Sequence, residues 1–169
     1  MLAPLDRLQS HFLKEIGLTT ETAFLEHNLL PLGTRRDISM LGLIYKCAHK
    51  IAHADLQLLF PPMDTTGHGH NTRLQSTQHP LQLKEERPGT KHGLLRRSVF
   101  GLTRVWNRLP GDAVMAATVT KLQVFLTELV RTSCHRFDRD WVDLLSPRPI
   151  LLRGSGYFQQ LQLRMYHNE

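Results

Sequence analysis

The sequence predicts a mainly α-helical protein. Large apolar residues recur at spacings of three and four rather than two, which is typical of amphipathic helices. Glycine and proline gather between these stretches, where they favour turns. We expect a small helical subdomain over residues 1–60 and a second small helical piece over residues 94–137. A flexible connector over residues 61–93 would join them, and residues 138–169 would form a weakly structured, partly disordered tail.

The first part of the chain predicts two short helices. In residues 5–16 the apolar side chains form one stripe, made of Leu5, Leu8, Phe12 and Ile16. Gly17 would end this helix, because glycine readily adopts the left-handed conformation found after helices. Thr19 or Thr20 can cap a second helix that runs to about Asn28.

Residues 32–60 are the longest stretch with helical periodicity. Thr34 stands three residues before Asp37, so we expect its hydroxyl to cap the helix while the carboxylate faces the positive helix end. The apolar stripe that follows contains Ile38, Leu41, Ile44 or Tyr45, and Ala48. Asp55 would cap a last short helix over residues 56–60.

The second helical piece contains the motif RVWNRLP. Residues 97–102 before it fit either a short strand or the start of a helix. Val105, Trp106 and Leu109 are expected to form an apolar group closed by a proline–glycine turn. Thr120 would then cap a helix over residues 121–134, whose inner face is Leu122, Phe125, Leu126, Leu129 and Val130. After it, Trp141, Leu144 and Leu145 can extend helical structure up to Pro147.

The positive charge is concentrated in one segment. The net charge is +6, and basic and acidic residues balance in every part of the chain except residues 91–137. There, the acidic residues are Asp112 and Glu128, and the basic residues are Lys91, Arg96, Arg97, Arg104, Arg108, Lys121, Arg131 and Arg136. This clustering favours a polyanionic partner such as RNA or DNA.

The candidate nucleic-acid-binding residues are Arg96, Arg97, Arg104, Trp106, Arg108 and Lys121. Basic side chains neutralise phosphates, and aromatic rings such as Trp106 and Phe100 can stack on bases. The alternative is that both aromatics are core residues and the arginines form a solvated rim. Arg35 and Arg36 can add a phosphate contact or be offset locally by Asp37.

Other chemistry has little support in the sequence. His49 and His53 lie one helical turn apart, but Cys47 points elsewhere on the wheel, whereas a zinc site needs three or four protein ligands. The residues around Gly154-Ser155-Gly156 lack the lysine of a phosphate-binding loop, and no nucleophile with a recognisable base is present. We therefore expect no catalytic residue, metal, cofactor or small-molecule substrate.

The two cysteines, Cys47 and Cys134, match no disulfide framework. The N-terminal residues lack the pattern of a signal peptide, and no apolar run approaches the roughly 18 residues of a membrane span. These observations predict an intracellular protein, cytoplasmic or nuclear and not secreted, without a membrane partner.

The order of these segments resembles the extreme C-terminal region of non-LTR (LINE-type) retrotransposon reverse transcriptases. The resemblance covers about residues 5–135 and is carried by LDRLQSHFLKEIGLT, AFLEHNLLPLGTRRDISMLGLIYKCAH and RRSVFGLTRVWNRLP. Its most specific parts are PLGTRRDISMLGLIYK and RVWNRLP. In that family the region follows the polymerase palm and thumb.

The resemblance implies a non-catalytic fragment. The aromatic-Ala-Asp-Asp sequence of the polymerase is absent, so none of the family's catalytic residues is carried over, and we expect no enzymatic activity. The expected function is at most accessory RNA or DNA binding through residues 91–136, with other parts of a reverse transcriptase as further partners. The alternatives are a helical protein-interaction module, in which the stripe of residues 32–60 faces a partner, and a remnant of an element with no selected function.

Overall fold

The computed structural model describes residues 3–63, 79–85, 98–136 and 138–147. The prediction of a mainly helical fold is confirmed. The elements are α1 (Ala3–Glu15), α2 (Thr20–His27), α3 (Leu32–Ala48), α4 (Ala54–Leu58), the 3₁₀ helix η2 (Val99–Leu102), α6 (Thr103–Trp106), α7 (Gly111–Val114), α8 (Val119–His135) and the 3₁₀ helix η3 (Trp141–Asp143).

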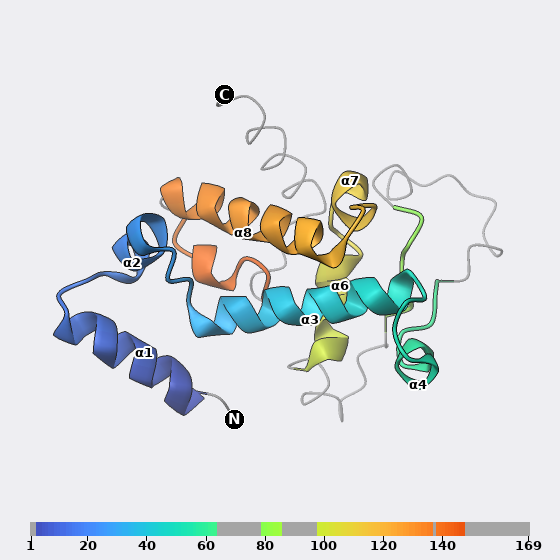
Figure 1. Cartoon of the computed structure of the whole chain (residues 1–169), viewed down its shortest axis with the longest axis horizontal. Helices are drawn as coiled ribbons and strands as arrows, with labels where there is room; N and C mark the ends of the chain where they lie inside the picture. Colours follow the sequence, from blue (N-terminus) through green and yellow to red (C-terminus); the bar gives the residue numbers. More distant parts are fainter. Residues whose placement is uncertain (1–2, 64–78, 86–97, 137, 148–169) are drawn as a thin grey trace.

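Helices α3 and α8 form the centre of the fold and lie side by side (Figure 1). Leu41 and Ile44 of α3 are fully buried, and α8 contributes Leu122, Leu126, Leu129 and Val130. Gly42 allows a close approach, because a Cβ atom there would lie 2.9 Å from the side-chain nitrogen of Gln123 on α8. The predicted inner face of α8 is thus confirmed, with Phe125 partly buried beside it.

The starts of two helices differ from the predictions. Helix α8 is capped by Thr118, whose hydroxyl accepts from the Lys121 N–H at 3.2 Å, so the prediction of Thr120 was wrong. Both threonines precede the same apolar stripe, and the sequence alone does not distinguish them. Helix α4 begins at Ala54, and the side chain capping it is His53, which accepts from the Asp55 N–H at 3.4 Å.

Thr34 does not cap α3, although the sequence predicted that it would. The helix already begins at Leu32, after Pro31, and Thr34 lies within its first turn. The Thr34 hydroxyl instead donates to the carbonyl oxygen of Val142 at 2.7 Å. By contrast, one of the two predicted N-caps of α2 is confirmed, since Thr19 accepts from the Thr22 N–H. The helix ends at Asn28 as expected, and this residue adopts the left-handed conformation.

Part of the predicted connector is packed into the core. Leu83 is 2% exposed, and Pro62 and Leu83 form an antiparallel bridge. The Asn107 side chain holds the Leu83 backbone at both ends, accepting from its N–H at 2.9 Å and donating to its carbonyl at 2.8 Å. The indole N–H of Trp106 donates to the Leu81 carbonyl at 2.8 Å. Residues 79–85 are therefore part of the fold, while 64–78 and 86–93 lie outside the described residues.

The first part of the predicted tail also belongs to the core. The ring of Trp141 stacks on Phe24 of α2, with 5.6 Å between the ring centroids, and Leu145 is fully buried. Instead of the predicted helical extension up to Pro147, a short 3₁₀ helix is present in this region. The two predicted helical pieces consequently share one hydrophobic core. Residues 148–169 lie outside the described chain.

The apolar stripes of α1 and α3 differ in burial. The apolar stripe of α3, which the interaction-module hypothesis placed against a partner, is buried in the core, so that assignment was wrong. The stripe of α1 is exposed instead, with Leu5, Leu8, Phe12 and Ile16 between 49% and 66% accessible. Helix α1 lies at the periphery, beside α2 and α3 (Figure 1).

Candidate functional site

The structure brings two of the predicted basic residues together. Arg104 and Arg108 lie one helical turn apart at the RVWNRLP motif, and the Arg104 Nε atom is 3.1 Å from the Glu85 carboxylate. Burial lowers the pKa of Arg108, the charge of Glu85 raises it, and the charge of Arg104 lowers it further. The Glu85 carboxylate thus lies near both guanidinium groups. The Nη1 atom of Arg108 is buried and has no hydrogen-bond partner within the described chain.

The two aromatic candidates are packed inside the fold. Trp106 is fully buried, and its ring meets Tyr45 and His79 edge to face, with centroids 6.4 Å and 5.8 Å apart. Phe100 is half-buried and stacks on Phe60 at 5.5 Å. Because the core covers the faces of its ring, Trp106 cannot stack on a nucleic-acid base in this fold.

The other basic candidates are distributed over different elements. Lys121 is exposed in the first turn of α8. Arg131, a basic residue of the same segment that was not a candidate, stabilises the fold, since its guanidinium lies 4.8 Å from the centre of the Phe24 ring and donates to Asn28 at 3.0 Å. Arg96 and Arg97 lie outside the described residues.

The arginine pair at the start of α3 is divided between two environments. The Nη2 atom of Arg36 donates to both carboxylate oxygens of Asp6 of α1, at 2.8 and 2.9 Å, whereas Arg35 is exposed. The carboxylate of Asp6 that binds Arg36 comes from α1. This contact helps to hold α1 against the rest of the fold.

The histidines and cysteines weighed as ligands have structural contacts. His49 Nε2 is 2.8 Å from the Val114 carbonyl oxygen, and Cys47 is buried. Within the described ranges, no three His, Cys, Asp or Glu side chains are grouped so that they could hold a metal.

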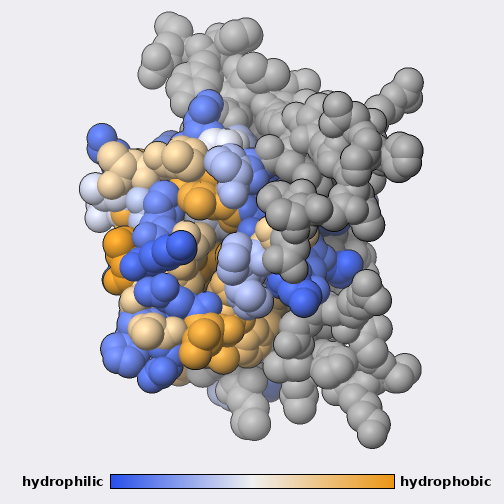
Figure 2. Space-filling model, turned by 90° about the vertical axis from the view of Figure 1, so that its right-hand side faces the viewer, coloured by the Kyte–Doolittle hydropathy of each residue, from blue (hydrophilic) through white to orange (hydrophobic). Residues whose placement is uncertain are grey.

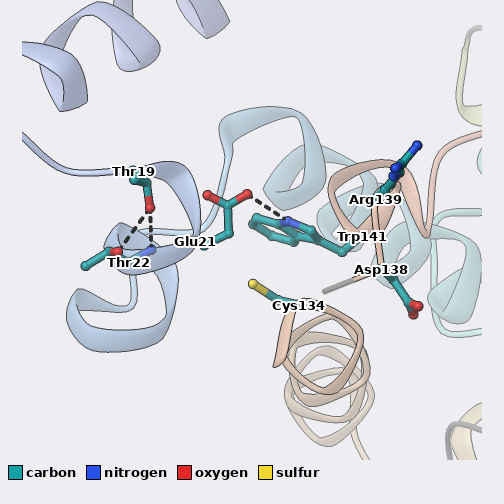
Figure 3. A pocket seen from close by; sticks show the side chains of 7 residues that line it. All are labelled: Thr19, Glu21, Thr22, Cys134, Asp138, Arg139 and Trp141. Carbon is teal, nitrogen blue, oxygen red and sulfur yellow. Dashed lines mark hydrogen bonds between the residues drawn. The ribbon is translucent and has the colours of Figure 1, made fainter. Parts of the chain in front are cut away.

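A pocket of about 400 Å³ lies between the start of α2 and the segment before η3 (Figure 3). It is lined by Thr19, Glu21, Thr22, Cys134, Asp138, Arg139 and Trp141. Glu21 reaches toward Trp141 and accepts from its indole N–H at 3.3 Å, and the hydroxyl of Thr19 caps α2. Burial, followed by the charge of Glu21, raises the pKa of the Cys134 thiol to about 11, so this thiol is not a ready nucleophile.

Sequence reasoning missed this pocket. Its lining residues come from two segments more than 100 positions apart, and no short motif connects them. The Glu21 carboxylate and the Thr19 hydroxyl have structural roles, and the Cys134 thiol is protonated near neutral pH. This arrangement does not provide a nucleophile beside a base.

Comparison with known proteins found no matching family model, no similar curated protein and no similar solved structure. Among the described helices, none is long and apolar enough to cross a membrane.

Proposed function

We propose that this chain is a non-catalytic, helical RNA- or DNA-binding module of the kind that the C-terminal region of a LINE-type reverse transcriptase would supply. The observation that carries the proposal is the Arg104–Arg108 pair, which shares Glu85 as its nearby carboxylate. This pair lies in the segment that holds the net charge of +6. A phosphate group would offer further negative charge to the two guanidinium groups.

The proposed binding is directed at phosphates rather than at bases. Trp106 is fully buried in the core. Its ring therefore cannot contribute the base stacking to nucleic-acid binding that the sequence suggested. Contacts made by arginine to phosphate release counterions, so affinity should fall steeply as salt is added. We expect weak binding with little sequence preference.

Gel-shift titration at two salt concentrations tests this proposal, with variants that each remove two positive charges. Arg104→Gln/Arg108→Gln tests the pair in the fold, and Arg96→Ala/Arg97→Ala tests the preceding arginines. The matched control is Lys14→Ala/Lys46→Ala, because both lysines are exposed on other helices. Weaker binding by the first two variants, with the control unchanged, supports the proposal. Equal loss in all three would indicate attraction by net charge alone and refute this site.

A second candidate function, a protein-interaction module, is favoured by a different observation. The exposed stripe consists of three large apolar side chains of α1, Leu5, Leu8 and Phe12, and of Ile16 directly after the helix. Apolar residues gathered in this way are typical of a protein–protein contact. In this form of the hypothesis the contact surface is α1 and not α3.

A further inference from the structure

The backbone next to Glu85 is fixed by hydrogen bonds that involve neither arginine of the proposed site. Two residues before it, the Asn107 side chain binds both backbone groups of Leu83, at 2.9 and 2.8 Å. One residue before it, the N–H of Lys84 donates to the carbonyl oxygen of Pro61 at 2.9 Å. The fold itself therefore keeps Glu85 beside the two arginines.

The two carboxylate oxygens of Glu85 have different partners. Oε2 accepts from the Nε atom of Arg104 at 3.1 Å, and Oε1 lies 3.4 Å from the Nδ2 atom of Asn107. The carboxylate also acts on Arg108, whose pKa is lowered by burial and raised by the charge of Glu85. Its negative charge is therefore felt by both arginines that would bind a phosphate group.

The ion pair between Arg104 and Glu85 contributes little to the stability of the fold. Both side chains are partly exposed, and ion pairs in contact with solvent are weak. The hydrogen bonds made by the side chains of Asn107 and Trp106 remain when the charge of Glu85 is removed. Loss of that charge should therefore change what the arginines bind and leave the free energy of unfolding nearly unchanged.

A phosphate group bound to Arg104 would lie close to the Glu85 carboxylate. Two anions that contact one guanidinium group repel each other, so the carboxylate opposes the phosphate even where both fit. We propose, on the basis of the proposed function, that Glu85 is an autoinhibitory contact, a carboxylate that competes with nucleic-acid phosphate for Arg104. The weak binding expected of this site follows in part from that competition.

Two exposed apolar surfaces have, among the described residues, no feature that identifies an occupant. One is the stripe that begins in α1, and the other includes Ile51 and Leu58, next to and within α4, which are 65% and 78% exposed. Figure 2, which views the molecule from the end where α4 lies, shows apolar groups separated by polar ones beside the residues drawn in grey. At Glu85, by contrast, the charges and their distances indicate an anionic ligand.

Fluorescence anisotropy with a labelled single-stranded RNA at low salt measures this competition in the full chain. Glu85→Gln removes the charge and keeps an oxygen that can accept from Arg104. It should bind about threefold more tightly than wild type, because two unit charges about 6 Å apart repel by roughly that factor even in bulk water. Glu85→Ala should show a similar gain. Glu128→Gln is the matched control, since Glu128 is also paired with an arginine, Arg131 at 3.3 Å, and it should change the affinity less.

The gain should depend on the two arginines. When Glu85→Gln is added to Arg104→Gln/Arg108→Gln, it should change the affinity no more than Glu128→Gln does. Equal gains from Glu85→Gln and Glu128→Gln in the otherwise wild-type chain would overturn the proposal, and so would weaker binding by Glu85→Gln, which would mean that Glu85 orients Arg104 for phosphate. Affinity lost in Arg104→Gln/Arg108→Gln without a gain in Glu85→Gln refutes the competition alone, whereas no loss in that double variant refutes the site itself.

Discussion

The hydroxyl of Thr34 donates a 2.7 Å hydrogen bond to the carbonyl oxygen of Val142, which lies 108 residues further along the chain. This bond joins the first turn of α3 to η3, and Thr34 is 1% exposed. The N-terminal helices and residues 138–147 therefore stabilise each other. In the described chain they pack around one hydrophobic core.

Replacing Thr34 by valine should lower the free energy of unfolding by about 1–2 kcal/mol, because the carbonyl of Val142 loses its donor in a partly buried place. Chemical denaturation measures the change. Thr127→Val is the matched control, since its hydroxyl bonds at 2.8 Å to the carbonyl of Gln123 in the preceding turn of its own helix. Such a local bond contributes less to the fold, and equal losses in both variants would contradict the role assigned to Thr34.

The intensity of the intrinsic tryptophan fluorescence should change little when RNA binds. The chain has two tryptophans, and Trp106 and Trp141 are 0% and 3% exposed. Base stacking on an indole would quench its emission, whereas phosphate contacts to arginine leave the buried rings unchanged. Titration with single-stranded RNA should therefore leave the emission intensity nearly constant. Quenching that disappears in Trp106→Phe would show that bases reach this ring.

Stability should decrease as the pH falls below about 6.5, in part through His79. Burial lowers the pKa of this imidazole below its ordinary value, and the bond to the Trp106 carbonyl only partly opposes this. A group with a lowered pKa in the folded state binds protons more readily when unfolded. Its stabilising effect is therefore complete above the unfolded pKa and is lost as the pH falls toward the folded pKa.

Denaturation at several pH values between about 7.5 and 5 compares wild type with His79→Gln, which has no titratable group at this position. The variant should be less stable overall but should lose less stability across this range. A parallel pH dependence in the two proteins would rule out His79 as a source of the effect.

Both cysteines should resist alkylation while the protein is folded. Burial raises the pKa of the Cys47 thiol, and burial with the charge of Glu21 raises that of Cys134 to about 11. Near pH 8 very little thiolate is present, and neither sulfur is accessible. Mass spectrometry after iodoacetamide treatment should find no modification in native buffer and two in denaturant. A Ser39→Cys variant, which carries an exposed cysteine on α3, provides the positive control.

The long helices were predictable because the spacing of apolar residues that specifies them lies within a short stretch of sequence. In α8 the residues Leu122, Leu126 and Leu129 recur at helical spacing, and the buried face follows directly from that period. The spacing does not, however, say whether an apolar stripe meets the core or a partner. Helices α1 and α3 both carry such a stripe, and their burial is opposite. That outcome depends on which helix packs against α8.

The segments that the sequence treated as connector and tail were harder to predict. Residues 79–85 contain few large apolar side chains, and they are fixed by hydrogen bonds from Trp106 and Asn107, about 25 residues away. Hydrogen bonds of this kind produce no periodic pattern of apolar residues in the sequence. Prediction of the candidate site was limited in the same way. The clustering of arginines could be predicted from the sequence, whereas the Glu85 contact and the burial of Trp106 could not.

The salt dependence of binding to single-stranded RNA tests the proposed function most directly. The logarithm of the association constant should fall linearly with the logarithm of salt concentration, at about 0.7 per phosphate contact. In Arg104→Gln/Arg108→Gln the slope should become shallower by about 1.4 if each arginine makes one contact, while Lys14→Ala/Lys46→Ala keeps the wild-type slope. A slope that is unchanged in Arg104→Gln/Arg108→Gln would contradict the assignment of nucleic-acid binding to this pair.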